Sequence, residues 1–458
     1  MRLNDLAMWS EGKLVGADQS LNQLVIDSRR VAAGDVFLAL KGERFDGHDF
    51  LAEVAQAGAQ AAVVEQPTTA FANYVQVNDS RRALGLIAKG WCDQFALRRV
   101  AVTGNAGKTS VKEMIACLLG EHTLATAGNL NNDIGVPLTL LRADASQRFG
   151  VFELGASHAG EIAWTASLVQ PEVVLITNVT GAHLGGFGSM QGIANAKAEI
   201  FAAAARGASA IINRDDSFAD FFSEQARAAG LTLISVASAS DSKADFRGSD
   251  WHEDAAGSHF VLHHQGNSWP VTLSLPGRHQ LSNALQAIAA VAALGLDVSE
   301  CLPRLASMQP VAGRMVRHQL ACGLLVDDSY NANPGSVLAA GRWLATQPHP
   351  QLFVLGGVAE LGEQEVALHQ QMGRELAELS IDQLVTVGER ARPAAAAFGK
   401  AALAVAQHDE ALPCARDTLA AGGSVLVKGS RSAAMERVVD ALLAEMRTGQ
   451  NGIIEERH

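Results

Sequence analysis

The residues of this chain best placed for chemistry lie in the segment Arg98–Leu119, which reads RRVAVTGNAGKTSVKEMIACLL. Gly104 and Gly107 allow a tight backbone turn, and the N–H groups of such a turn can surround a polyphosphate. Lys108 follows directly and can reach the terminal phosphates as a point charge, and the Thr109 hydroxyl can bind Mg²⁺. The spacing therefore predicts a site for a nucleoside triphosphate.

The elements on either side must hold this turn in place. Apolar residues over Val100–Val102 predict a buried parallel strand, and the apolar spacing over Val111–Leu118 predicts one face of a helix. Only two residues separate the glycines, where the ordinary phosphate loop G-x-x-x-x-G-K-[ST] has four. Taken alone, the stretch also fits a plain strand, turn and helix. The nucleotide contacts expected here are Gly104, Asn105, Ala106, Gly107, Lys108, Thr109 and Ser110.

Two strand ends carry side chains that can bind a metal ion beside the turn. The run Gly150–Leu154 is expected to form a core strand that brings Glu153 to its end. The next strand is expected over Val173–Val179 and leads to His183. Because the carboxyl ends of parallel strands meet at one edge of a sheet, both side chains would lie near Thr109. We therefore predict a metal site here, although either residue alone would usually be structural.

The sequence TGNAGKTS at 103–110 resembles the nucleotide loop of the Mur ligases and of their folate-polyglutamate ligase relatives. Enzymes of this family use ATP to join an amine to a carboxylate. A kinase or a mechanical ATPase is the looser alternative, but the sequence carries no acceptor-site or coupling motif of either. The resemblance therefore implies a ligase that uses ATP and Mg²⁺.

Three motifs near the N-terminus resemble the uridine-nucleotide-binding domain of the family members that add the third amino acid and the final dipeptide. They are DSR at Asp27–Arg29, GDVFLALKG at Gly34–Gly42 and DGHDF at Asp46–Phe50. DSR and DGH are also common turn sequences, which is the structural alternative. Substrate contacts are expected at Ser28, Leu40, Lys41, Gly42, Asp46 and His48.

Two further motifs distinguish between family members. NNDIGVP at 131–137 and DDSYNANP at 327–334 closely match the member that adds D-alanyl-D-alanine, and the third-residue ligase differs at the second motif. The first motif should form a loop over the peptide end of the substrate, with turn capping as the alternative for a lone Asn. Ser430 and Arg431 can hold the carboxylate of the dipeptide. The substrate contacts expected from this part of the chain are Asn131, Asn132, Ser157, Ser430 and Arg431.

The remaining nucleotide contacts come from later in the chain. The family pattern G-x-H-x-x-x-N is met at 277–283, so the resemblance implies that Asn283 contacts adenine. Asp328 can accept a hydrogen bond from ribose, and the Tyr330 ring can stack on adenine. Arg314, in PVAGRM, should reach the γ-phosphate when the second and third domains close.

Lys197 lies in AKAEI, on a helix expected over Gln191–Ala204. In Mur ligases a lysine at this position is often carbamylated, which converts a cation into an anion that can bind a second Mg²⁺. The resemblance implies this role for Lys197, with ordinary salt bridging as the alternative. The metal ligands expected in total are Thr109, Glu153, His183 and Lys197, and the catalytic residues are Lys108, Glu153, His183, Lys197 and Arg314.

The length of the chain, 458 residues, suffices for about three domains. Strand and helix patterns alternate, which indicates an α/β fold. We expect a small N-terminal α/β uridine-nucleotide domain over 1–82, a central P-loop ATPase with a parallel sheet over 83–312, and a C-terminal Rossmann-like domain over 313–458. Apolar and polar residues alternate over 231–275, which predicts an antiparallel appendage. No G-x-G-x-x-G follows the first strand of the third domain, which argues against a dehydrogenase.

Composition excludes several classes. A net charge of −12 argues against a nucleic-acid partner. The five cysteines are odd in number and widely spaced, which favours a reducing cytoplasm over a disulfide framework or zinc site. The N-terminus lacks the apolar core of a signal peptide, and the longest apolar run is too short to span a bilayer. We expect a cytoplasmic monomer with no membrane span.

The resemblance implies a defined reaction. The enzyme would join D-alanyl-D-alanine to UDP-N-acetylmuramoyl-tripeptide through an acyl phosphate formed from ATP, in the synthesis of peptidoglycan precursors. The nucleotide tripeptide and the dipeptide are its expected partners. The alternatives are the sibling ligase that adds the third, diamino acid residue, and a P-loop ATPase that is not a ligase.

Overall fold

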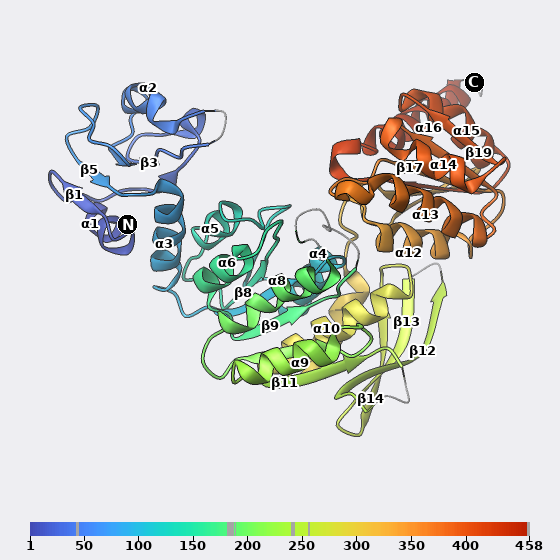
Figure 1. Cartoon of the computed structure of the whole chain (residues 1–458), viewed down its shortest axis with the longest axis horizontal. Helices are drawn as coiled ribbons and strands as arrows, with labels where there is room; N and C mark the ends of the chain where they lie inside the picture. Colours follow the sequence, from blue (N-terminus) through green and yellow to red (C-terminus); the bar gives the residue numbers. More distant parts are fainter. Residues whose placement is uncertain (43–44, 181–186, 188, 240–242, 255–256, 456–458) are drawn as a thin grey trace.

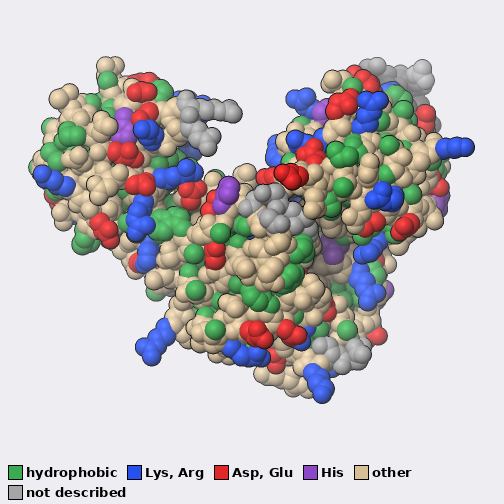
Figure 2. Space-filling view, in the orientation of Figure 1, with side chains coloured by type: hydrophobic (Ala, Val, Ile, Leu, Met, Phe, Trp, Pro, Cys, Tyr) green, Lys and Arg blue, Asp and Glu red, His purple; other side chains and the backbone are tan. Residues whose placement is uncertain are grey.

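The structure is a computed structural model that describes residues 1–42, 45–180, 187, 189–239, 243–254 and 257–455. The chain folds into three domains, each built on its own β-sheet. The first and third domains stand apart on either side of the central one (Figure 1). An open hollow lies between them in the space-filling view (Figure 2).

The first domain has a five-stranded sheet in the order β1-β5-β4-β3-β2, in which only β1 runs antiparallel to its neighbour. The sequence pattern predicts strands over Leu24–Asp27, Gly34–Leu40 and Ala61–Glu65. The structure has all three, each shorter than predicted, together with β1 and β5, which the pattern did not predict. The elements are α1 (Leu3–Trp9), β1 (Lys13–Val15), β2 (Leu24–Val25), β3 (Val36–Leu38), α2 (Leu51–Gln56), β4 (Ala61–Val64) and β5 (Tyr74–Gln76).

Helix α3 (Ser80–Cys92) connects the first and central domains. Its residues Leu84 and Ile87 are buried in the core of the first domain, whereas Ala88 and Cys92 are buried in a core of the second. The boundary expected between residues 82 and 83 therefore falls inside one continuous helix, which packs against both domains.

The central sheet has nine strands in the order β14-β13-β12-β11-β10-β9-β6-β8-β7. Helices α4 and α10 pack on one face, and α3, α5, α6, α8 and α9 contribute to the core on the other. The strands are β6 (Arg98–Thr103), β7 (Thr123–Ala125), β8 (Phe149–Glu153), β9 (Val173–Ile176), β10 (Ser209–Asn213), β11 (Thr232–Ala237), β12 (Phe246–Asp254), β13 (Gly257–His264) and β14 (Asn267–Leu273). The helices are α4 (Lys108–Leu119), α5 (Gly135–Leu140), α6 (Glu161–Val169), α8 (Met190–Ala202), α9 (Ala219–Ala228), α10 (His279–Ala293) and α11 (Val298–Cys301).

Two expectations for this domain need correction. The antiparallel appendage is confirmed for β12 to β14, but β11 pairs in parallel with β10 and belongs to the main sheet. Pro137 is predicted to start a helix that continues over Leu138–Leu141, because proline favours the first helical position, but the helix begins at Gly135 instead. The Asn132 side chain, two residues before the N-cap Ile134, accepts a hydrogen bond from the Gly135 N–H and so satisfies one N–H of the first turn.

The third domain has a six-stranded sheet in the order β15-β16-β20-β17-β18-β19, with only β15 antiparallel to its neighbour. This wound sheet confirms the predicted Rossmann-like class. The sequence pattern predicts four of its strands, over Leu324–Asp327, Leu352–Leu355, Leu384–Val387 and Val425–Val427, but not β15 or β19. The strands are β15 (Val316–Leu320), β16 (Gly323–Asp328), β17 (Gln351–Gly356), β18 (Gln383–Val387), β19 (Ala402–Val405) and β20 (Ser424–Lys428). The helices are α12 (Pro334–Leu344), α13 (Glu365–Glu378), α14 (Arg392–Phe398), α15 (Leu412–Ala420) and α16 (Glu436–Glu455). Within the described residues, no helix has the length and apolar character needed to cross a membrane.

Candidate active site

The glycine turn stands between β6 and the N-terminus of α4, as its sequence predicts. Gly104 has φ +140° and Gly107 has φ +79°, a region in which side chains other than glycine are strained. A Cβ atom at Gly107 would lie 2.7 Å from Asn283 Oδ1. Only glycine therefore permits both the turn and the close approach of α10.

Two residues at the end of β9 hold the turn. The backbone N–H groups of Asn105 and Ala106 donate to Asn178, at 3.0 Å each, and the Thr177 hydroxyl donates to the Ala106 carbonyl at 2.6 Å. These two N–H groups are thus bonded to protein, which corrects the expectation that the whole turn faces the phosphates. The N–H groups in the first turn of α4, from Lys108 to Ser110, are the ones that helix geometry leaves for an anion.

Four polar side chains converge beside the turn. The Thr109 hydroxyl donates to Glu153 Oε2 at 2.7 Å, and Asn131 Nδ2 donates to Glu153 Oε1 at 2.8 Å. Arg314, from the third domain, donates from Nη2 to Thr109 Oγ1 at 2.9 Å. Glu153 is 3% exposed, so its carboxylate is buried with both oxygens bonded. The parallel pairing of β6 and β8 causes this convergence, because it sets Val102 opposite Glu153.

Lys108 and Arg314 bring two positive charges to this cluster. Lys108 Nζ donates to the Gly104 carbonyl at 2.8 Å, and the Arg314 guanidinium lies 4.5 Å from the centroid of the Tyr330 ring. Enclosure by the cavity walls lowers the pKa of Lys108, the charge of Arg314 lowers it further, and Glu153 raises it. Two cations therefore stand beside the turn in a chain that is acidic overall, and such a local pair suits a polyphosphate.

A cavity of about 760 Å³ opens above the turn, between the central and third domains. It brings together most of the residues that were predicted to contact ATP or the peptide, from segments far apart in the chain. The predicted residues that line it are Asn105, Ala106, Gly107, Lys108, Thr109, Ser110, Asn131, Asn132, Glu153, Ser157, Asn283, Arg314, Asp328, Tyr330 and Arg431. Its volume falls within the range typical of ligand sites.

The three residues Asp328, Ser430 and Arg431 of the third domain, all predicted to contact substrates, make contacts within the protein that the sequence did not predict. Asp328 forms a buried ion pair with Lys428, at 2.6 Å, so a neighbouring cation already compensates its carboxylate. The Ser430 hydroxyl is buried and donates to the Gly357 carbonyl at 2.5 Å, and Ser430 does not line the cavity. Arg431 lines the cavity and pairs with Glu436 at 3.0 Å.

The predicted uridine contacts gather elsewhere, in the first domain. Ser28 follows β2 and Leu40 follows β3, and these strands are parallel, so both residues lie at the same edge of the sheet. Lys41 pairs with Asp46 in a short antiparallel bridge. Asp46 accepts from the His48 backbone at 2.9 Å and pairs with its ring, and the other ring nitrogen of His48 accepts from the Glu65 N–H. Gly42 closes the same loop through its N–H, which donates to the Phe45 carbonyl at 2.9 Å.

Lys197 and His183, the other predicted metal ligands, are not part of the described cavity wall. Lys197 is buried on α8, with Nζ 5.7 Å from the centroid of the Phe187 ring. Burial lowers the pKa of Lys197 to about 7, and the nearby charge of Lys108 lowers it too. His183 lies outside the described residues. Within those that are described, no group of three or more His, Cys, Asp or Glu side chains could hold a metal ion.

Sequence reasoning missed several residues of this site. Asn178 ends an apolar run, and no motif marked it as a functional residue. Lys428 lies just before Ser430 and Arg431, which were given a substrate role, but was given none itself. Arg81 lines the cavity from the start of α3 and forms an ion pair with Asp133 at 2.5 Å. Its position after the helix cap at Asp79 looked like ordinary helix sequence.

Three family descriptions match the chain in order. "Mur ligase family, catalytic domain" matches residues 20–91, "Mur ligase middle domain" matches 102–291, and "Mur ligase, glutamate ligase domain" matches 313–431. Together they cover most of the chain, including every segment that lines the candidate site.

Among known proteins, the chain is similar to UDP-N-acetylmuramoyl-tripeptide–D-alanyl-D-alanine ligases. It is 42% identical to that of Escherichia coli strain K12, over 96% of this chain and 98% of the relative. It is 36% identical to that of Haemophilus influenzae, over 95% and 97%.

Solved structures show the same likeness. A crystal structure of MurF from Acinetobacter baumannii has a TM-score of 0.91 and 36% identity, over 96% of this chain and 98% of that one. MurF ligase from Thermotoga maritima, in complex with ADP, has a TM-score of 0.83 and 27% identity, over 93% and 98%.

Proposed function

The chain belongs to the Mur ligase family, and on this premise we propose that it joins D-alanyl-D-alanine to UDP-N-acetylmuramoyl-tripeptide with the use of ATP. The relatives that carry this activity in their names align with nearly the whole chain. The observation that carries the proposal is the convergence of Lys108, Glu153 and Arg314 on one cavity together with the peptide-loop residue Asn131.

The reaction needs activation because a carboxylate has no adequate leaving group. A carboxylate oxygen of the tripeptide attacks the γ-phosphorus of ATP, the bond from phosphorus to the bridging oxygen breaks, and ADP leaves. The amine of D-alanyl-D-alanine then attacks the carbonyl carbon of the acyl phosphate. The amine loses a proton, inorganic phosphate leaves, and an amide remains. No side-chain nucleophile is required.

The protein contributes positive charge and positioning to the first step. Lys108, the first N–H groups of α4 and Arg314 surround the place where the γ-phosphoryl group would lie, and they stabilise the charge that develops during transfer. Arg314 now donates to Thr109. A bound triphosphate would compete for that guanidinium and draw the third domain toward the turn.

The residues at the turn also fit Mg²⁺. The Thr109 hydroxyl and the Glu153 carboxylate are the oxygen donors that this ion prefers, and their oxygens already lie 2.7 Å apart. When bound, the ion would neutralise charge on the phosphate oxygens. Asn131 keeps the Glu153 carboxylate oriented by donating to its other oxygen.

Substrate recognition is divided among the three domains. We assign the uridine nucleotide to the sheet edge of the first domain around Ser28 and Leu40, and the peptide to the loop with Asn131 and Asn132. Arg431 is the third-domain cation best placed to pair with the dipeptide carboxylate, because it lines the same cavity. We propose a cytoplasmic enzyme, since its ATP supply is cytoplasmic, and we expect it to act as a monomer.

For Lys197 we propose carbamylation, on the resemblance to the family and on its burial beside Lys108. Lys197→Ala should lower phosphate release by at least about 10–100-fold, the loss that is typical when even an outer-shell partner of a metal is removed. Short carboxylic acids such as acetate should restore part of the activity, because they replace the missing anion. Initial rates are measured with and without the acid.

Lys108→Ala is the matched control for this rescue, since it removes a neighbouring, partly buried amine for which no carbamylation is proposed. Acetate should not restore its activity. An unchanged rate for Lys197→Ala, or an equal response of both variants to acetate, would exclude the carbamate.

The proposed function itself is tested by phosphate release from ATP in the presence of UDP-N-acetylmuramoyl-tripeptide. We expect release to depend on D-alanyl-D-alanine and to be matched by amide product, measured by mass spectrometry. Release that depends instead on a diamino acid, with the dipeptide nucleotide as acceptor, would identify the sibling ligase. Phosphate release without amide product would indicate an ATPase that is not a ligase.

A further inference from the structure

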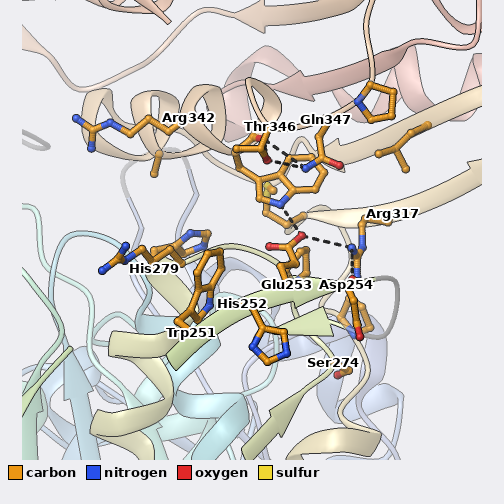
Figure 3. A pocket seen from close by; sticks show the side chains of 18 of the residues that line it. Trp251, His252, Glu253, Asp254, Ser274, His279, Arg317, Arg342, Thr346 and Gln347 are labelled. Atoms are coloured by element: carbon orange, nitrogen blue, oxygen red, sulfur yellow. Dashed lines mark hydrogen bonds and ion pairs between the residues drawn. The ribbon is translucent and has the colours of Figure 1, made fainter. Parts of the chain in front are cut away.

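A second, larger cavity of about 1620 Å³ lies between the central and third domains, beside the first. Glu253, near the end of β12, stands in its wall and faces Arg317 of the third domain (Figure 3). The proposed reaction makes no use of Glu253, although its side chain is only 16% exposed. Burial of a carboxylate to this extent costs free energy unless hydrogen-bond donors or positive charges compensate its charge.

Glu253 has such partners in three different segments. Its Oε1 accepts a hydrogen bond from the Trp343 indole N–H at 2.9 Å and lies 3.5 Å from Arg317 Nη1. Its Oε2 accepts from the backbone N–H of Gly277 at 2.8 Å. Both oxygens of one carboxylate are therefore engaged, each toward a different domain.

These partners connect the third domain to the nucleotide-binding side of the central domain. Trp343 lies on α12 and Arg317 on β15, both in the third domain, and Trp343 is packed in that domain's core. Gly277 belongs to the turn that leads into α10, the helix that holds Asn283 against Gly107 of the phosphate turn.

The second link between the domains lies on the nucleotide side, where Arg314 donates to Thr109. Arg314 follows Gly313, which has φ +70° and packs against Tyr330. A rotation of the third domain near Gly313 would shift Trp343 and Arg317 relative to Glu253. Hydrogen bonds weaken steeply with distance and angle, so the rotation would displace the Glu253 carboxylate and weaken its hydrogen bond with the Gly277 N–H.

We infer that Glu253 is a positioning residue that couples the placement of the third domain to the nucleotide-binding end of α10. With Glu253 in place, Trp343 and Arg317 hold the carboxylate, and the carboxylate holds the Gly277 turn so that Asn283 stays against Gly107. Without it, α10 and the third domain would adjust independently, and nucleotide would bind less tightly. This inference rests on the proposed function only in taking the phosphate turn to bind ATP.

The test compares Glu253→Ala, Trp343→Phe and the double variant, with Glu224→Ala as the control because Glu224 is an exposed carboxylate on α9 of the same domain. Trp343→Phe keeps an aromatic ring in the core and removes the indole donor together with the five-membered ring that carries it. ADP affinity is measured by calorimetry without turnover, and KM for ATP and kcat are measured by phosphate release.

Glu253→Ala should weaken ADP binding and raise the KM for ATP by about 10-fold, within the usual range of coupling between sites, while kcat changes far less. Trp343→Phe should shift both values in the same direction, and the double variant should be no worse than Glu253→Ala, because both changes break one link. Glu224→Ala should match the parent.

A purely structural role would lower the melting temperature and the active fraction without moving ADP affinity or KM, and that result would overturn the inference. So would additive effects of the two substitutions. If the parent bound ADP but formed no amide, the proposed ligase activity would fail, while the ADP affinities of the variants would still decide the role of Glu253.

Discussion

Lys108→Ala is expected to remove nearly all phosphate release while leaving the fold intact. The ammonium group belongs to the phosphate turn and lines the cavity, and its replacement removes charge stabilisation in an enclosed site. Loss of one such donor typically costs about 10²–10³-fold in rate. The melting temperature should change by only a few degrees, because Lys108 Nζ makes one short hydrogen bond, to the Gly104 carbonyl, and such a bond contributes about 1 kcal/mol.

Rates of phosphate release and thermal unfolding are measured on the same preparations. Lys400→Ala removes an exposed lysine of the third domain and should behave like the parent in both assays. Normal turnover by Lys108→Ala would remove the glycine turn from the mechanism. Loss of activity together with a large loss of stability would leave Lys108→Arg as the deciding variant, since it keeps the charge but not the shape, and full activity there would contradict a site-specific role.

Glu153→Gln is expected to have the second largest effect. The substitution keeps the size of the side chain and its contacts with Thr109 and Asn131, because an amide can both donate and accept. It removes the negative charge that faces Lys108 and Arg314 and that suits a divalent cation. Phosphate release should fall by about 10²-fold or more at ordinary Mg²⁺ concentrations, and the Mg²⁺ concentration for half-maximal rate should rise.

The measurement is a Mg²⁺ titration of the initial rate for the parent and the variant. Glu121→Gln, which changes an exposed carboxylate in the turn after α4, should leave the titration unchanged. A Glu153→Gln enzyme with the Mg²⁺ dependence and rate of the parent would show that this carboxylate holds no metal.

Much of this protein was predictable from local sequence. The order of an apolar run, a glycine turn and an amphipathic stretch predicted β6, the turn and α4, because backbone conformation there depends on residues a few positions apart. The place of Glu153 beside the turn was predictable as well, because ligand sites in parallel sheets lie at the carboxyl ends of the strands, where this carboxylate stands. The class of all three domains followed from the alternation of strand and helix patterns.

The tertiary structure decided which side chains contact the residues of the site. Asn178 holds the turn because β9 pairs beside β6, and Lys428 compensates Asp328 because β20 pairs beside β16. Packing likewise decides that the Ser430 hydroxyl bonds the Gly357 carbonyl, away from the cavity, and that α3 contributes to the cores of two domains. Residue type and spacing along the chain determine which chemistry is available. Which side chains meet is determined by strand register and domain contacts, and these join residues tens to hundreds of positions apart that carry no local signal of each other.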